Sequence, residues 1–233
     1  MNILVTGATK GIGKAIADEL RGDNVIFAAS RNEELLQNYE NYCVCDLATV
    51  EGMEKLGRYI EEHCIDVLVN NAGEYIYNAI DETDIKKLEH IMRLNLEAPL
   101  FLASKAVPYM KSKGFGRIIN IGSISGVTGE AYASLYSASK SGLIGAAKAL
   151  ALELAEYGIT VNTINPGWVD TDMGNSSADE GEFSKEEIIE CIPQKRFVEP
   201  SEVAGMVRYL ISERAKGVTG QAINLCAGLT CGC

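Results

Sequence analysis

The sequence predicts one α/β domain over residues 1–233, in which helices cover both faces of a seven-stranded parallel sheet. Two observations support this class. Short, largely apolar and partly β-branched runs alternate with helix-length segments along the chain, as expected when both faces of a parallel sheet are covered. No Pro/Gly/Ser-rich linker divides the chain. Right-handed crossovers between such strands build a three-layer doubly wound fold of the Rossmann type.

The expected strands follow one another along the whole sequence. A glycine-rich turn at 6–13 and a helix at 14–21 connect the first two strands, so the chain opens with a βαβ unit. Ligands of doubly wound sheets bind beyond the carboxyl ends of the strands, so residues that directly follow a strand are the candidates for a site. The strands are expected at 3–5, 25–29, 42–45, 66–69, 117–121, 159–164 and 222–225.

Composition and charge exclude several functions. The chain has 21 Lys and Arg against 32 Asp and Glu, and its net charge of −11 repels a nucleic-acid backbone. It contains neither an apolar run long enough for a membrane span nor a basic stretch ahead of one, so we expect a cytoplasmic protein. A serine hydrolase would need a histidine base and a nucleophile elbow, and His63 and His90 lie in helical patterns without one.

The seven cysteines, an odd number, argue against a disulfide framework, and we expect reduced thiols. Cys231 and Cys233 are separated by one residue, and no histidine lies near them in sequence. We therefore predict no metal site, with metal binding or a redox role of this pair as the alternatives.

One segment differs from the rest in composition. Residues 174–181 are small and polar, and a helical pattern follows at 184–192. This arrangement suits a substrate lid at about 172–195, with an ordinary solvated loop as the alternative.

The turn after the first strand reads Thr-Gly-Ala-Thr-Lys-Gly-Ile-Gly, from Thr6 to Gly13, and it opens a helix. Glycines let the backbone approach a pyrophosphate, and a helix N-terminus offers unpaired N–H groups and a positive dipole end to the anion. Glycine turns also serve plain strand-to-helix connections, so this motif alone does not decide between the two interpretations.

Two cations lie near the expected adenosine ribose. Arg31 follows the second strand, where an acidic residue would accept hydrogen bonds from a free 2′-hydroxyl, and Lys10 in the glycine turn can reach the same region. A guanidinium and an ammonium there would pair with a 2′-phosphate, which favours NADP(H). The alternative is that both are solvated surface cations.

The candidate chemistry lies in a helical pattern that starts at Tyr136 and runs to about Tyr157. Tyr136 and Lys140 are four residues apart, which places both on one helix face. A phenol with a reference pKa of about 10 is a poor acid at neutral pH, and a nearby ammonium lowers that pKa. Ser123 follows the strand 117–121 at its carboxyl end, where the cofactor is expected, and this favours a catalytic site over a surface pair.

These motifs together resemble the short-chain dehydrogenase/reductase family. Its pattern Thr-Gly-x-x-x-Gly-x-Gly matches Thr6 to Gly13, and its Tyr-x-x-x-Lys motif with a preceding serine matches Tyr136, Lys140 and Ser123. Asn95 matches the family's asparagine on the preceding helix, and the likeness continues through the segment 218–221 near the end.

The resemblance implies an NADP(H) site along the ends of the strands. Asp46 corresponds to the family's aspartate at the adenine ring, and the Pro-Gly segment with Val169 and Thr171 corresponds to the contacts of the nicotinamide amide. The implied cofactor-binding residues are Thr6, Gly7, Thr9, Lys10, Gly11, Ile12, Gly13, Arg31, Asp46, Leu47, Asn71, Ala72, Gly73, Tyr136, Lys140, Pro166, Gly167, Val169 and Thr171.

The resemblance also implies how the catalytic residues Ser123, Tyr136, Lys140 and Asn95 act on a ketone or a secondary alcohol. Ser123 and Tyr136 would hydrogen-bond the carbonyl oxygen, and Tyr136 would give it a proton. Lys140 would lower the pKa of Tyr136 and hold the nicotinamide ribose, and Asn95 would anchor a water that connects Lys140 to solvent. We assign Ser125, the rival serine, to the pocket wall.

Among relatives, the chain looks like 3-oxoacyl-acyl-carrier-protein reductases and polyketide ketoreductases. Those enzymes commonly carry an arginine where this chain has Glu156 and Tyr157, which weakens the case for an acyl carrier protein partner; Lys111, Lys113 and Arg117 offer a partial substitute. A free small ketone, a steroid, a sugar or a polyol is the alternative substrate. A catalytically silent dinucleotide-binding sensor or scaffold is the alternative of another class.

Further residues are expected to line or cover a partly aromatic pocket: Tyr75, Tyr77, Glu130, Tyr132, Trp168, Met173 and Phe183. The resemblance also implies a homotetramer or homodimer, assembled through the helices that carry Tyr136 and Asn95. Small residues on the first of these helices would permit close packing, namely Gly142, Gly145, Ala146 and Ala149.

Overall fold

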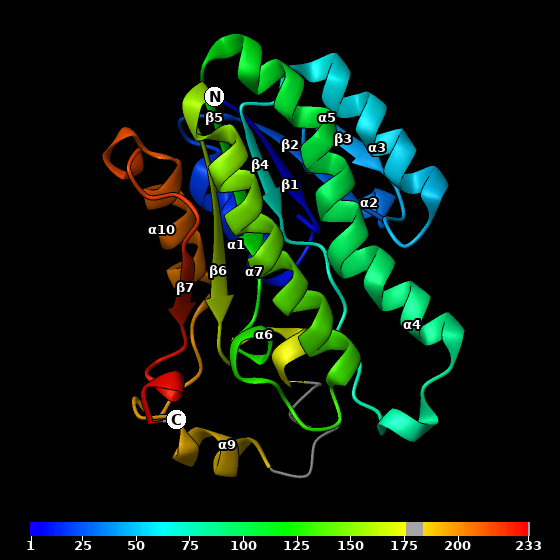
Figure 1. The fold of residues 1–233 in the computed structure, drawn as a ribbon, viewed down its shortest axis with the longest axis vertical. Coiled ribbons are helices and arrows are strands. Elements are labelled where there is room, and N and C mark those ends of the chain that lie inside the picture. Colours follow the sequence, from blue (N-terminus) through cyan, green and yellow to red (C-terminus); the bar gives the residue numbers. More distant parts are fainter. Residues whose placement is uncertain (176–183, 233) are drawn as a thin grey trace.

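Seven parallel strands form one sheet in the order β3-β2-β1-β4-β5-β6-β7 (Figure 1). The computed structural model describes residues 1–175 and 184–232. Both the doubly wound sheet and all seven predicted strands are confirmed, with ends that differ by at most two residues. The strands are β1 Asn2–Thr6, β2 Val25–Ser30, β3 Asn41–Val44, β4 Val67–Asn70, β5 Gly116–Ile121, β6 Ile159–Pro166 and β7 Ala222–Leu225.

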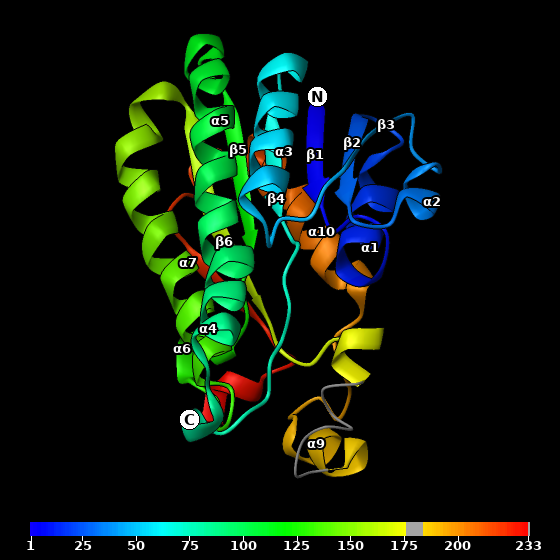
Figure 2. The ribbon, with the colours of Figure 1, turned by 90° about the vertical axis from the view of Figure 1, so that its right-hand side faces the viewer.

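Helices cover both faces of the sheet, which Figure 2 shows from the side. One apolar cluster joins the sheet to α3 (Val50–His63), α5 (Ala98–Lys113) and α7 (Ser134–Leu154). A second cluster joins its other face to α1 (Gly11–Leu20) and α10 (Pro200–Ile211). The central strands are buried on both faces, which explains their apolar sequences.

Shorter helices lie around the carboxyl ends of the strands, at the lower end of Figure 1. They include α4 (Ile85–Met92), α6 (Ser125–Thr128) and α9 (Lys185–Cys191), while α2 (Glu33–Leu36) lies beside β2 and β3. Since β1 pairs with both β2 and β4, the strand order reverses at β1. This reversal opens the crevice in which doubly wound folds bind ligands.

Two helices that carry candidate residues begin earlier than predicted. The helix expected at 14–21 is α1, which begins at Gly11 because the last residues of the glycine turn already form its first turn. The helix expected from Tyr136 is α7, which begins at Ser134, and a 3₁₀ turn extends it to Tyr157. Both helices therefore present their candidate residues within the first two turns.

Part of the expected lid at 172–195 lies outside the described residues, namely 176–183, which include Phe183. The helix predicted at 184–192 is α9, and Ser184 caps it by accepting a hydrogen bond from the Glu187 backbone N–H. Ile188 of α9 lines the cavity described below. The function of this segment as a lid stays a prediction.

The sequence predicted no membrane span, no disulfide and no metal site. Within the described ranges, no helix is both long and apolar enough to cross a membrane. The six cysteines among these residues are unpaired, and Cys233 lies outside them. The same part of the chain has no group of three or more His, Cys, Asp or Glu side chains that could hold a metal ion.

Candidate active site

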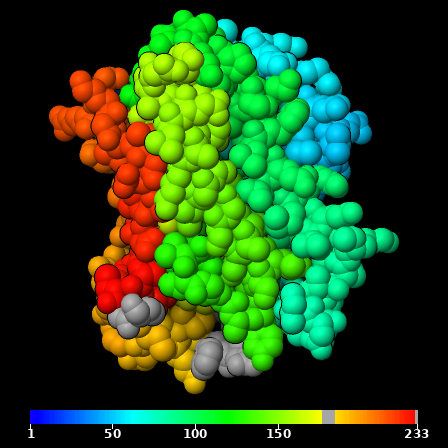
Figure 3. All heavy atoms as spheres, in the orientation of Figure 1, coloured from blue at the N-terminus to red at the C-terminus, as the bar shows by residue number. Residues whose placement is uncertain are grey.

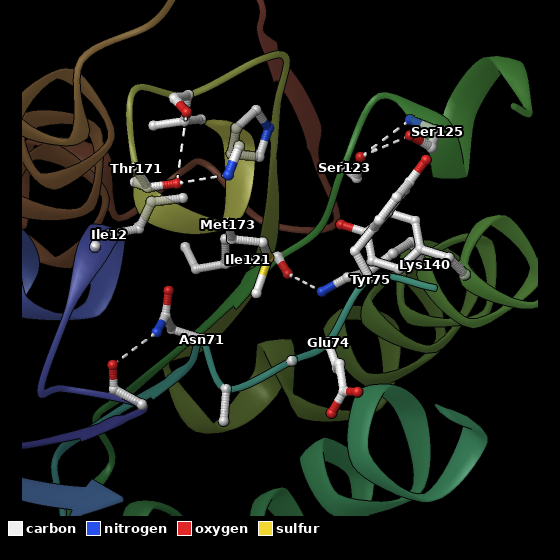
Figure 4. A pocket seen from close by; sticks show the side chains of 18 of the residues that line it. Ile12, Asn71, Glu74, Tyr75, Ile121, Ser123, Ser125, Lys140, Thr171 and Met173 are labelled. Carbon is white, nitrogen blue, oxygen red and sulfur yellow. Dashed lines mark hydrogen bonds between the residues drawn. The ribbon is translucent and has the colours of Figure 1, made fainter. Parts of the chain in front are cut away.

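A cavity of about 600 Å³ runs along the carboxyl ends of the strands. It extends from the glycine turn and Arg31 at one end to Tyr136 and Lys140 at the other, and Figure 4 shows part of its wall. Its size falls within the range of ligand pockets. Of the predicted cofactor-binding residues, all but Thr6 and Gly13 line it, and of the predicted catalytic residues, all but Asn95 do.

Thr6 and Gly13 shape the glycine turn from behind. The Thr6 hydroxyl accepts hydrogen bonds from the backbone N–H groups of Asn71 and Ala72, both at 3.0 Å. The Asn71 amide in turn donates to the Thr6 carbonyl at 2.9 Å. A Cβ at Gly13 would lie 2.2 Å from the Gly7 carbonyl oxygen, so only glycine fits there. These contacts hold the first turn of α1 against the segment after β4.

The residues at this end fit the pyrophosphate and adenosine of a dinucleotide. The N-cap of α1, Lys10, makes no side-chain capping bond, so the N–H groups of the first turn stay available to an anion. Lys10 and Arg31 both line the cavity, and neither forms an ion pair with any described residue. Two cations in the cavity wall without an ion-pair partner among the described residues suit the 2′-phosphate of NADP(H).

Asp46, which the sequence predicted at the adenine ring, lines the cavity. Its carboxylate accepts a hydrogen bond from the Ala48 backbone N–H at 3.0 Å, and its carbonyl accepts one from the Thr49 hydroxyl at 2.8 Å. Thr49 then caps α3 through the Gly52 backbone N–H. Asp46 and Leu47 are fixed in this way where they line the cavity. Cys45, which the sequence did not suggest, lines it beside them.

The structure brings Ser123, Tyr136 and Lys140 together at the other end. A Cβ at Gly126 would lie 2.8 Å from that of Lys140, so glycine lets α6 pack closely on α7 and bring the segment after β5 to Tyr136. The Ser123 hydroxyl lies close enough to the Tyr136 phenol to influence its pKa. The Lys140 Nζ donates to the Ile121 carbonyl at 2.8 Å and lies 5.7 Å from the centre of the Tyr136 ring.

The prediction that Lys140 lowers the pKa of Tyr136 is wrong for this structure. Burial raises the pKa of Tyr136 to about 12; the Ser123 hydroxyl opposes this rise and the charge of Glu130 adds to it. Burial also lowers the pKa of the Lys140 ammonium to about 8. Both shifts have one cause, since a poorly hydrated site disfavours the charged form of each group.

Asn95 lies behind this cluster in a π-helical turn, Arg93–Glu97, between α4 and α5. Its amide donates to the Glu74 carbonyl at 2.9 Å, and its Oδ1 accepts from the Glu74 N–H at 3.0 Å. A Cβ at Gly73 would lie 3.1 Å from Asn95 Oδ1 and 3.3 Å from Lys140 Nζ. Asn95 and Lys140 therefore both lie close to the same point beside Gly73. π-Turns of this kind recur at functional sites.

Glu130, which the sequence predicted only as a pocket residue, lies at the centre of a hydrogen-bond network. Its carboxylate accepts from the Ser125 hydroxyl at 2.6 Å and from the Tyr75 hydroxyl at 2.8 Å. The Ser125 and Ser123 hydroxyls are 3.1 Å apart (Figure 4). Ser125 lies in the pocket wall as predicted, but it also links Glu130 to the candidate catalytic serine.

Aromatic rings surround this network. The Tyr75 ring meets the Tyr136 ring edge to face at 5.1 Å, and the Tyr77 and Tyr132 rings are 5.4 Å apart. Tyr132 has a φ of 59°, a strained backbone for this residue type. Trp168 and Met173 also line the cavity, as does Glu74, which the sequence did not suggest.

One predicted surface does not form as expected. Arg117 is 2% exposed, so its side chain is not available to an acyl carrier protein. Its buried position in β5 and its hydrogen bonds to the Gly116 and Gly158 carbonyls account for this. Lys113 pairs with Asp66, and Lys111 Nζ lies 3.9 Å from Glu153 Oε1. The basic patch proposed from the sequence is therefore largely neutralised.

Known proteins resemble this chain over nearly its full length. A family model described as enoyl-(acyl carrier protein) reductase matches residues 7–230. The 3-oxoacyl-[acyl-carrier-protein] reductase of Rickettsia bellii is 38% identical, over 97% of this chain and 95% of the relative. That of Vibrio harveyi is 37% identical, over 97% and 96%.

A solved structure is also similar over nearly the full length of the chain. A crystal structure of a variant of the actinorhodin polyketide ketoreductase with NADPH superposes with a TM-score of 0.91 and is 39% identical in sequence. The match covers 98% of this chain and 96% of that one.

Proposed function

The chain belongs to the short-chain dehydrogenase/reductase family, and we propose that it is an NADPH-dependent ketoreductase whose substrate is a 3-oxoacyl thioester. One observation carries the proposal: Ser123, Tyr136 and Lys140 converge at one end of a cavity whose other end is a glycine turn at a helix N-terminus. The names of the relatives support the substrate class.

The proposed reaction transfers a hydride and a proton to a ketone. Bound NADPH supplies the hydride, which adds to the carbonyl carbon. The hydroxyls of Ser123 and Tyr136 donate hydrogen bonds to the carbonyl oxygen, where negative charge develops. Tyr136 gives its proton to that oxygen, so the products are a secondary alcohol, NADP⁺ and a phenolate that must be reprotonated.

Lys140 and Asn95 serve the reprotonation in this proposal. Lys140 uses one N–H for the Ile121 carbonyl, which leaves two donors for the ribose hydroxyls of the cofactor. A lysine whose pKa is lowered to about 8 exchanges protons readily near neutral pH. Asn95 and Lys140 face one point beside Gly73, where a water would connect them to solvent.

The cofactor preference follows from Lys10 and Arg31. Both are free of ion pairs with the described residues and line the end of the cavity assigned to adenosine. We propose that they bind the 2′-phosphate of NADPH. The similar actinorhodin ketoreductase was crystallised with NADPH, which agrees with this choice.

A 3-oxoacyl thioester can reach the site on a carrier protein or as a free pantetheine thioester. Because Arg117 is buried and Lys113 is paired, we propose that the pantetheine thioester itself is recognised more strongly than a carrier protein. A sugar or polyol substrate is the second candidate, because Glu130 places a carboxylate in the pocket wall that could accept a hydrogen bond from a substrate hydroxyl.

Steady-state assays test the function. We would measure NADPH oxidation with acetoacetyl thioesters of N-acetylcysteamine, coenzyme A and acyl carrier protein, and with ketoses, diketones and ketosteroids. The proposal predicts reduction of all three thioesters, with little gain from the carrier protein. A preference for a ketose would favour the second candidate, and NADPH binding without any turnover would favour a silent sensor.

Association of subunits is a further proposal from the family likeness. Figure 3 shows the face of the molecule formed by α4, α5 and α7. Leu152 on α7 is 87% exposed and Leu100 on α5 is 39% exposed. Burial of these side chains would favour a dimer or tetramer through this face. Light scattering of the purified protein would measure its mass.

A further inference from the structure

Ser123 has one hydroxyl hydrogen, and the network around it determines where that hydrogen can go. The Ser125 backbone N–H donates to Ser123 Oγ at 3.1 Å, so one lone pair of Ser123 is already used. The two hydroxyl oxygens are 3.1 Å apart, with Ser123 as the donor and Ser125 Oγ as the acceptor. A carbonyl substrate needs Ser123 to donate to the substrate.

Glu130 accounts for this direction of the bond between the two serines. A carboxylate has acceptors and no donors, so both Ser125 and Tyr75 must point their hydrogens at it. The 2.6 Å bond from Ser125 to Glu130 commits the hydrogen of Ser125, which leaves its oxygen as an acceptor toward Ser123. Ser123 then cannot receive a hydrogen from Ser125 Oγ, and its own hydrogen can turn to Ser125 or to a substrate oxygen.

Glu130 is also held in place by Tyr75. Tyr75, on the segment after β4, donates to Glu130 at 2.8 Å, and its ring packs edge to face on Tyr136. The carboxylate therefore bridges the segment after β4 and α6. Gly129 next to it has a φ of 76°, a backbone that glycine adopts without strain.

The charge of Glu130 acts on Tyr136 as well. Within the part of the chain that the structure describes, three titratable groups face the phenol: Lys140 on its own helix, Glu130 on the segment between α6 and α7, and Tyr75 after β4. Lys140 directs its hydrogen bond to the Ile121 carbonyl. A nearby negative charge disfavours a second one, so the pKa of Tyr136 rises in the presence of Glu130.

We propose that Glu130 is a positioning residue that holds the site in the form needed for carbonyl reduction, with Tyr136 protonated and Ser123 free to donate. Reduction needs a protonated phenol, whereas oxidation of the alcohol needs a phenolate to accept the proton. At a given pH, Glu130 thus raises the rate of ketone reduction relative to the rate of alcohol oxidation. The inference rests on the proposed ketoreductase function.

Two variants separate the two roles of the carboxylate. In Glu130→Gln the side chain keeps its shape and loses its charge. We expect the pH at which ketone reduction falls to half its maximum to move down by about one unit. The pH at which alcohol oxidation rises should move down equally, so oxidation at a fixed alkaline pH becomes about 10-fold faster relative to reduction.

In Ser125→Ala the charge stays and the link to Ser123 is lost. Alanine cannot donate a hydrogen to Ser123, just as Ser125 cannot while it is bonded to Glu130, so we expect kcat for reduction to stay within about twofold of the wild type and both pH midpoints to stay unchanged. Glu74→Gln is the matched control, because its carboxylate lines the same cavity but bonds to His90 instead of Ser125. Its pH midpoints should equal those of the wild type.

A spectroscopic titration tests Glu130 even if no tested ketone is a substrate. We would follow tyrosinate absorbance with pH in the NADP⁺ complex and subtract the matching Tyr136→Phe form for both wild type and Glu130→Gln. A lower midpoint in Glu130→Gln supports the proposal. Equal midpoints in the titration and in both reaction directions would overturn it, and absent turnover by the wild type would overturn the proposed function alone.

Discussion

The two ends of the cavity are built on different physical principles. The adenosine end uses backbone N–H groups, glycines and the two cations Lys10 and Arg31, whose charges stay in contact with water. The chemical end uses Tyr136 and Lys140, whose poorly hydrated positions shift both pKa values. The adenosine end would bind an anion through the fixed charges of Lys10 and Arg31. At the chemical end, the protonation of Tyr136 and Lys140 depends on how far each group is removed from water.

The largest expected effect is on kcat, and it distinguishes the proton-transfer step from cofactor binding. Tyr136→Phe removes the proposed proton donor and leaves the ring packed against Tyr75. We expect kcat for ketone reduction to fall about 10³-fold while the Kd for NADPH changes little. Stopped-flow or steady-state assays measure kcat, and fluorescence titration measures Kd.

Tyr209→Phe serves as the control, since Tyr209 is 45% exposed on α10 and does not line the cavity. It should behave as the wild type. A Tyr136→Phe enzyme that keeps a tenth or more of kcat would assign the proton donor elsewhere.

The next largest expected effect is on KM for NADPH, at the adenosine end. The double variant Lys10→Ala/Arg31→Ala removes both cations from the proposed 2′-phosphate site. We expect KM for NADPH to rise about 10- to 100-fold with kcat nearly unchanged, because each charge-assisted contact contributes about 1.5–3 kcal/mol and some solvent screening remains. KM for NADH should stay constant, since that cofactor has no 2′-phosphate.

Lys14→Ala is its control, because Lys14 is an exposed cation of α1 that pairs with Asp18 and does not line the cavity. Equal increases in KM for NADPH and NADH in the double variant would contradict a role in 2′-phosphate recognition.

The contrast between the two ends also explains what the sequence could predict. Strand positions, the glycine turn and the spacing of Tyr136 and Lys140 are local patterns, and the structure places them as expected. The bond between Glu130 and Ser125 depends on how the segment between α6 and α7 folds back, which local sequence does not encode. The reversed pKa shift of Tyr136 depends on burial, and Arg117 was misjudged for the same reason.

The smallest expected effect concerns stability. Lys140 is 4% exposed, and burial lowers its pKa to about 8, from a reference value of about 10.4 in the unfolded chain. Between these two values the unfolded chain binds more protons than the folded one, so this group makes stability rise with pH. Below pH 8 the full penalty for a buried ammonium is present.

Lys140→Met removes that penalty and keeps a side chain of similar length. We expect the variant to be more stable than the wild type by about 1–3 kcal/mol near pH 7, despite losing activity, and the difference to shrink as pH rises toward about 10. Chemical denaturation at several pH values measures it. A difference that stays constant across this range would mean that Lys140 does not titrate differently in the folded protein, and its assigned part in proton exchange would lose its basis.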